Sequence, residues 1–270
     1  MSEHTHADGA VPEWERYSFR ERLLRYCALL GAFVVFAISW RLLNVRYEFV
    51  STAARELEDL FVRMFPPDVR YTTEIVSPLI ETIHIAILGT ILAICISIPV
   101  AYIAAENTTP NRLTYALGKF IISFTRSVNV IIWALVFVVV FGPTALAGVW
   151  AVAVRSIGFL GKLLSEEIEE IEPTTVEAVS ATGANGAQTL IYGVVPQILP
   201  AFIGIATYRW DINVRESTVI GFVGAGGIGT ALLTQIDFFE WSAVATILLA
   251  ILGAVVLSEA VSAYLRSRVR

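Results

Sequence analysis

Several long runs of apolar residues, almost free of charge, limit the fold of this chain more than any other feature. Hydrophobic residues make up 56% of the chain and charged residues 16%, and the mean hydropathy is +0.69. A soluble domain of 270 residues can bury a core, but it does not need uncharged runs of about 20 residues. Such runs suit helices that cross a lipid bilayer, because a helix pairs its own backbone polar groups. The sequence therefore predicts an all-α integral membrane protein.

Six runs have the length and composition of membrane spans. They cover residues 26–45, 79–105, 112–141, 144–164, 196–216 and 241–265. The polar segment at residues 1–25 has mixed charge and no apolar stretch, which is typical of a cytoplasmic tail rather than a signal peptide. Six spans place both ends of the chain on one side, so we expect the basic tail at residues 266–270 in the cytoplasm as well. We expect the fourth span to lie at the periphery of the bundle.

The predicted outer loop at residues 46–78 contains an amphipathic segment. Apolar residues recur every three or four positions over residues 50–65, and acidic and basic residues cover the other face. This pattern predicts an interfacial helix that ends at Pro66 and Pro67.

A glycine-rich segment, VIGFVGAGGIGT, joins the fifth and sixth spans at residues 219–230. Its glycines are too many for a stable lipid-facing helix, and irregular backbone at membrane depth is tolerated only when protein or a cavity surrounds it. We expect Gly224, Gly226, Gly227 and Gly229 to form a buried bend, followed by a short helix. The spacing also matches the dinucleotide fingerprint G-x-G-x-x-G, but the strand and the later acidic residue that this motif requires are missing.

Charge, cysteine content and the absence of certain motifs exclude several kinds of protein. A net charge of −5 argues against a nucleic-acid partner. Both cysteines lie in apolar runs, so we expect neither a disulfide framework nor a metal site. The chain has no phosphate-binding loop of the type G-x-x-x-x-G-K-[ST] and no recognisable catalytic set, so any ATP hydrolysis belongs to another chain. We expect no cofactor in this chain.

Ionisable residues lie near the middle of three predicted spans, where charge is costly and often functional. Arg126, Arg155 and Arg209 approach the membrane midplane in the third, fourth and fifth spans. Two polar stripes accompany them, consisting of Arg126 with Asn129, and of Arg209 with Asn213 and Glu216. One interpretation is a translocation path compatible with an anion. The other is structural neutralisation, for example of Arg126 by Glu216, and the sequence leaves both open.

The polar segment at residues 177–196, EAVSATGANGAQTLIYGVVP, lies between two spans within a predicted cytoplasmic loop at residues 165–195. Glu177, Ala178, Gly183 and Pro196 stand at the spacing E-A-A-x3-G-x9-I-x-L-P. The segment resembles the coupling loop of ABC importer permeases, which docks onto a separate ATPase. Val179 and Gly193 depart from the pattern.

A closer resemblance covers roughly residues 75–265, which look like permeases of phosphonate-type ABC importers. It is carried by RSVNVIIWALVFV, by SEEIEEIEPTTVEAVSATGANGAQTLIYGVVPQILP and by YRWDINVRESTVIGFVGAGGIGTALL. It implies a type I importer permease with a coupling helix that includes Glu177, Ala178, Gly183, Ala184 and Asn185. It also implies a second permease copy or a close paralogue, and an extracytoplasmic binding protein that delivers phosphonate, phosphate or a related oxyanion. Two ABC ATPase subunits would bind the ATP and magnesium.

Two rival functions remain. An ion-coupled secondary transporter of a small anion could use the charged residues within the spans, but such proteins usually contain two repeated halves, and this sequence shows no repeat. A membrane-embedded enzyme is a weaker alternative, because no catalytic set is recognisable.

Overall fold

The computed structural model describes residue 17, residues 19–44 and residues 46–269. Within them the chain forms helices and no strand, which confirms the all-α prediction. The chain divides into two compact units, which cover residues 1–59 and residues 60–270. Most of the predicted N-terminal tail, residues 1–16 and 18, lies outside the described residues.

The first unit contains α1 (Phe19–Leu42) and most of α2 (Tyr47–Met64). Helix α1 begins seven residues before the predicted span, so residues 19–25 are helical. Its apolar side chains are exposed within the unit, as expected for a helix whose surroundings are lipid. Helix α2 covers almost all of the predicted amphipathic segment and ends before Pro66.

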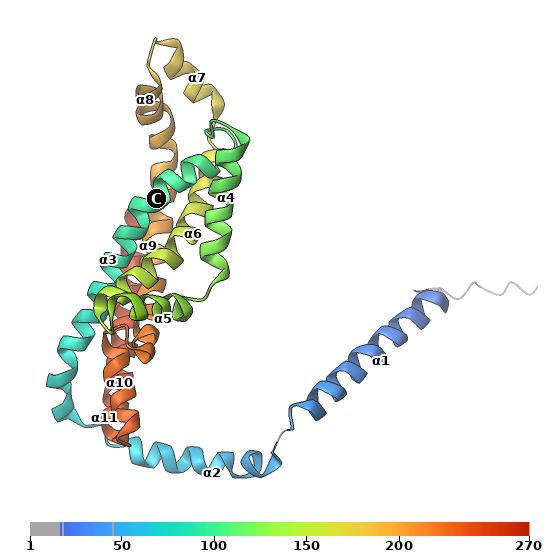
Figure 1. The fold of residues 1–270 in the computed structure, drawn as a ribbon, viewed down its shortest axis with the longest axis vertical. Coiled ribbons are helices and arrows are strands. Elements are labelled where there is room, and N and C mark those ends of the chain that lie inside the picture. The colour runs from blue at the N-terminus through green and yellow to red at the C-terminus, as the bar shows by residue number, and fades with distance from the viewer. Residues whose placement is uncertain (1–16, 18, 45, 270) are drawn as a thin grey trace, which may run out of the picture. The chain divides into compact units, whose positions relative to one another are not determined.

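The second unit is a helical bundle (Figure 1). Its long elements are α3 (Thr72–Ala104), α4 (Arg112–Ser127), α5 (Val130–Phe141), α6 (Ala145–Glu169), α9 (Val195–Ile220) and α11 (Trp241–Val269). Helix α6 packs against α3, α4, α5 and α9. The expectation that this fourth span lies at the periphery is therefore wrong. Its small residues, such as Gly148 and Gly158, allow neighbouring helices to approach closely on several sides.

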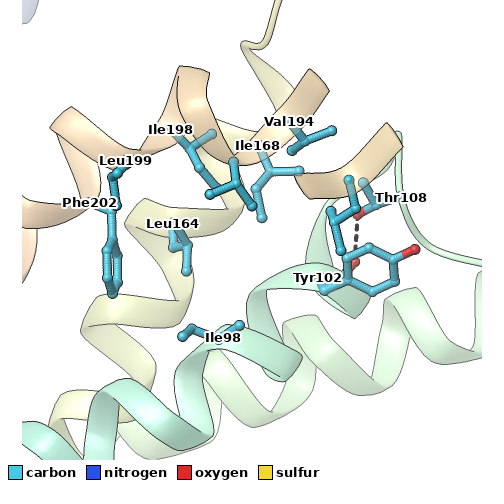
Figure 2. Close-up of a pocket in the computed structure, with 11 residues that line it drawn as sticks. Ile98, Tyr102, Thr108, Leu164, Ile168, Val194, Ile198, Leu199 and Phe202 are labelled. Carbon is cyan, nitrogen blue, oxygen red and sulfur yellow. Dashed lines mark hydrogen bonds between the residues drawn. The ribbon is translucent and has the colours of Figure 1, made fainter. Parts of the chain in front are cut away.

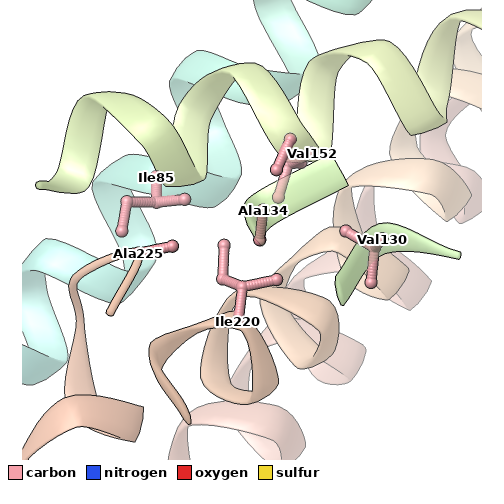
Figure 3. Close-up of a cluster of buried hydrophobic side chains, with 7 residues drawn as sticks. Ile85, Val130, Ala134, Val152, Ile220 and Ala225 are labelled. Atoms are coloured by element: carbon pink, nitrogen blue, oxygen red, sulfur yellow. The ribbon is translucent and has the colours of Figure 1, made fainter. Parts of the chain in front are cut away.

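A buried apolar cluster lies near the start of α6, away from α7 and α8. Ile85 of α3, Val152 of α6 and Ile220 of α9 meet there with Ala134 of α5 (Figure 3). Ala225, from the glycine-rich segment, packs into the same cluster. Residues from four helices and a loop thus share one core, which fixes the glycine-rich segment to the bundle.

The third predicted span is not one continuous helix. Helices α4 and α5 meet at a bend of 93°. The side chain of Asn129 accepts a hydrogen bond from the backbone N–H of Ile131 at 3.0 Å, so that it caps the start of α5. The sequence predicted that Arg126 and Asn129 share a helix face. They do not, because the helix breaks between them. Among the described residues, five helices are long and apolar enough to cross a membrane, or six if this bent pair counts as one span.

The glycine-rich segment forms a buried bend and then a short helix. A 3-10 turn, Gly221–Val223, follows α9, and α10 begins after the bend (Ile228–Asp237). Gly224, Gly226 and Gly227 have positive φ angles of 77–82°, a region that favours glycine. An added Cβ at Gly229 would lie 2.1 Å from the carbonyl oxygen of Thr218. The bend therefore needs glycine both for backbone conformation and for close packing.

Candidate functional site

The segment between α6 and α9 forms a helical hairpin at one end of the bundle, built from α7 (Pro173–Ala181) and α8 (Gly186–Thr189) (Figure 1). Gly183 turns the chain between them with a φ of +85°. The Asn185 side chain accepts a hydrogen bond from the Gln188 N–H at 3.0 Å, and the Gln188 side chain accepts one from the Asn185 N–H at 2.9 Å. This reciprocal cap gives the tip of the hairpin a defined shape.

Most of the residues predicted for coupling lie on the surface of this hairpin. Glu177, Ala178, Gly183 and Asn185 are exposed, and Ala184 is half-buried. A surface hollow lies beside them, lined by Val179, Thr182, Gly183, Ala184, Gln188 and Tyr192. A five-residue π-helix, Leu190–Val194, connects the hairpin to α9. The hairpin thus offers a shaped polar surface joined to a long bundle helix without an intervening loop.

A cavity of about 280 Å³ lies where α3 and α6 end and α9 begins (Figure 2). Its lining is apolar, with Ile98, Leu164 and Phe202 among the contributors, and includes no charged side chain. The hydroxyl of Thr108 at its edge already donates to the Tyr102 carbonyl at 2.6 Å. A small anion would gain too few donors here to replace its hydration, so this cavity is unsuited to an anionic substrate.

Arg209 is buried inside the second unit, with only 2% of its surface exposed. Its Nη2 donates to the Glu216 carboxylate at 2.8 Å and its Nε donates to the hydroxyl of Ser156 at 2.8 Å. The guanidinium also lies over the ring of Phe159, 5.3 Å from its centroid. The ion pair with Glu216 excludes the alternative in which Arg126 neutralises Glu216.

Asn213 extends this polar network across three helices. Its side-chain oxygen accepts a hydrogen bond from Ser156 of α6 at 3.0 Å, and its nitrogen donates to Thr90 of α3 at 2.8 Å. All three residues are buried. The sequence did not predict that Ser156 and Thr90 join this network, because a lone hydroxyl in an apolar run usually bonds only to its own helix.

The opposite side of α9 is tied to α11. Asp211 and Arg215 form an ion pair, as their i, i+4 spacing on one helix allows. The hydroxyl of Ser258 on α11 donates to the Asp211 carboxylate at 2.7 Å. Helix α9 is thus connected by polar side chains to α3, α6 and α11.

The two polar stripes expected from the sequence have different environments. Arg209 and Asn213 are buried and hydrogen-bonded within the bundle, and Glu216 is partly buried beside them. Arg126 and Asn129 are exposed, at the break between α4 and α5. The structure therefore does not bring the five residues together around one open surface.

Comparisons with known proteins agree with this architecture. The chain is 41% identical over 201 residues to the phosphite transport system permease protein PtxC of Stutzerimonas stutzeri, covering 74% of this chain and 73% of that protein. It is 42% identical over 189 residues to the phosphate-import permease protein PhnE of Mycolicibacterium smegmatis, covering 68% of this chain but 36% of that protein. The fold is similar to a chain of the MetNI methionine ABC transporter, with a TM-score of 0.64 and 22% identity over 77% of this chain and all of that one.

The family model described as the binding-protein-dependent transport system inner membrane component matches residues 97–270. This match includes the end of α3, the broken span, the hairpin, the glycine bend and α11. Because it covers well over half of the chain, the protein belongs to the family of binding-protein-dependent transport system inner membrane components.

Proposed function

We propose that this permease forms the translocation path for a small phosphorus oxyanion such as phosphite, phosphate or a phosphonate. The observation that carries the proposal is the extensive identity with a permease named for phosphite transport. The intramembrane arginines support it, because an oxyanion with one or two negative charges crosses an apolar region only where cations or dipoles offset its lost hydration. An extracytoplasmic binding protein delivers the anion, and two partner ATPases that bind ATP and magnesium drive the cycle.

The α7–α8 hairpin is the surface that we assign to the ATPase. Its exposed residues Glu177, Ala178 and Asn185 form the contact, and Gly183 keeps the tip narrow. Since the π-helix continues directly into α9, movement of the hairpin is transmitted to the helix that carries Arg209. This assignment puts the hairpin and both termini in the cytoplasm.

The path itself is assigned to the face of the bundle at the broken span, where a second permease copy or a paralogue would complete it. Arg126 and Asn129 are exposed on this face. Arg209 and Asn213 lie inside the bundle and hold α9 against α6 and α3, whereas Glu216 pairs with Arg209 within α9. The alternative of an ion-coupled secondary transporter is not favoured, because it has no use for an exposed coupling hairpin.

Reconstitution tests this function. The permease, its ATPase and its binding protein would be placed in proteoliposomes, and uptake of phosphite, phosphate and methylphosphonate would be measured with and without ATP. We expect ATP-dependent uptake of at least one oxyanion, which requires the binding protein. Uptake that proceeds without the ATPase and collapses when ion gradients are dissipated would refute the proposal in favour of a secondary transporter.

A further inference from the structure

Three arginines from three helices converge on one short stretch of α6. Arg155 belongs to this stretch, and Arg209 of α9 bonds to the next residue, Ser156. Arg126 of α4 crosses the stretch at Gly158, where an added Cβ would lie only 2.6 Å from the Arg126 Cγ. Arg155 and Arg209 are close enough to repel each other electrostatically. The sequence places these arginines on three separate spans, and only the packing of α4 and α9 on α6 brings them together.

The cluster lies near the middle of α6 along the helix axis. Helix α6 runs from Ala145 to Glu169, so Arg155 stands about 15 Å from its first residue and about 21 Å from its last, at about 1.5 Å per residue. In a span of this length the position is close to the membrane midplane. Charges at that depth must be paired, hydrated in a cavity or used in function.

The charges of the cluster do not balance. Glu216 bonds to Arg209, which uses its Nε and Nη2 and is almost fully buried. In the described part of the chain, no carboxylate lies within ion-pairing distance of Arg126 or Arg155. Arg126 is exposed and Arg155 is half-buried, so both can reach a molecule outside the bundle core. Two guanidinium groups thus lack a counter-charge at the depth where one is most needed.

We infer that Arg155, together with Arg126, contacts the transported oxyanion directly, whereas Arg209 is a positioning residue. This inference rests on the proposed function. A guanidinium presents planar, paired N–H donors that match two oxygens of a tetrahedral oxyanion, and such charge-assisted pairs are among the strongest hydrogen bonds in proteins. The Arg209–Glu216 ion pair is complete within α9, and the Arg209–Ser156 hydrogen bond holds α9 against α6. Among the described residues, Arg155 is therefore left as a cation without a carboxylate partner.

Uptake by the reconstituted transporter tests the assignment of Arg155. We expect Arg155→Gln to lower uptake of the accepted oxyanion at least tenfold, while the melting temperature and the mass of the assembled complex stay unchanged. Lys162→Gln on the same helix is the matched control and should retain full uptake, because Lys162 forms an ion pair with Glu166 of its own helix at 3.2 Å. Arg209→Gln should instead lower the melting temperature, and adding Glu216→Gln should restore it, because the buried carboxylate is then no longer left unpaired.

A charge-rescue experiment separates direct contact from a structural role. Arg155→Cys, in a Cys27→Ser and Cys95→Ser background, would be treated with a thiol reagent that adds an ammonium group or with a neutral reagent of similar size. We expect only the cationic reagent to restore part of the uptake, and we expect free phosphate to slow the labelling. If lipid phosphate were the counter-ion, free phosphate would not slow it.

Three results would overturn the inference while the wild-type transporter still imports an oxyanion. The first is uptake by Arg155→Gln above half of the wild-type rate. The second is loss of assembly in that variant, which would indicate that the second permease supplies a counter-charge. The third is equal rescue by both reagents. Absence of any oxyanion uptake by the wild type would instead refute the proposed function itself.

Discussion

Replacing Gly158 by alanine should separate α4 from α6 and destabilise the bundle. The new Cβ would lie 2.3 Å from the Thr125 hydroxyl oxygen and 2.7 Å from the Ile122 carbonyl oxygen, whereas ordinary contacts begin near 3.4 Å. The Ile122 oxygen belongs to the backbone, so no rotamer change relieves the clash, and α4 must withdraw by about 0.7 Å (3.4 − 2.7). Over-packing of this kind costs about 1–3 kcal/mol of unfolding free energy.

The cost should appear as a lower melting temperature of the purified permease in detergent, followed by tryptophan fluorescence. For a chain of this size, 1 kcal/mol corresponds to about 2–4 °C, so we expect a fall of about 2–12 °C. Gly161→Ala, one turn along α6, is the matched control, because its Cβ would have only side-chain atoms as nearest neighbours, Ile122 at 3.3 Å and Val100 at 3.6 Å. Equal melting temperatures for the two variants would refute the reasoning that direct contact at Gly158 sets the distance between α4 and α6.

Three further predictions concern the hairpin, the topology and the buried network. Gly183→Val forces a β-branched residue to a positive φ and should uncouple ATP hydrolysis from uptake. Gly183→Asn should retain coupling, because asparagine tolerates that conformation. Equal uptake by both variants would contradict the assignment of the hairpin to ATPase coupling. Cysteine introduced at Asp59 should react with an impermeant reagent in intact cells and cysteine introduced at Asn185 should not, and the reverse pattern would invert the topology. Asn213→Leu should lower the unfolding free energy by about 1–3 kcal/mol, because two buried hydroxyls each lose one hydrogen-bond partner, and an unchanged melting temperature would contradict this.

Local features of the fold could be predicted from the sequence because they depend on nearby residues. Apolar runs of sufficient length identified the spans, and the apolar period over residues 50–65 identified the amphipathic helix α2. Both follow from the bilayer thickness and the helical period, which act over one segment at a time. The break after Arg126 was missed, because a single Asn cap in a continuous apolar run carries little signal.

The surroundings of the intramembrane charges depended on tertiary structure. The sequence determined that Arg126, Arg155, Arg209 and Glu216 lie within spans, but it left their partners open. Packing of α9 on α6 brought Arg209 to Ser156 and left Arg155 without a carboxylate in the described part of the chain. The central position of α6 likewise came only from its contacts with four other helices. The physical reason is that an ion pair needs two groups within about 4 Å, and residues far apart in sequence reach that distance only when their helices pack.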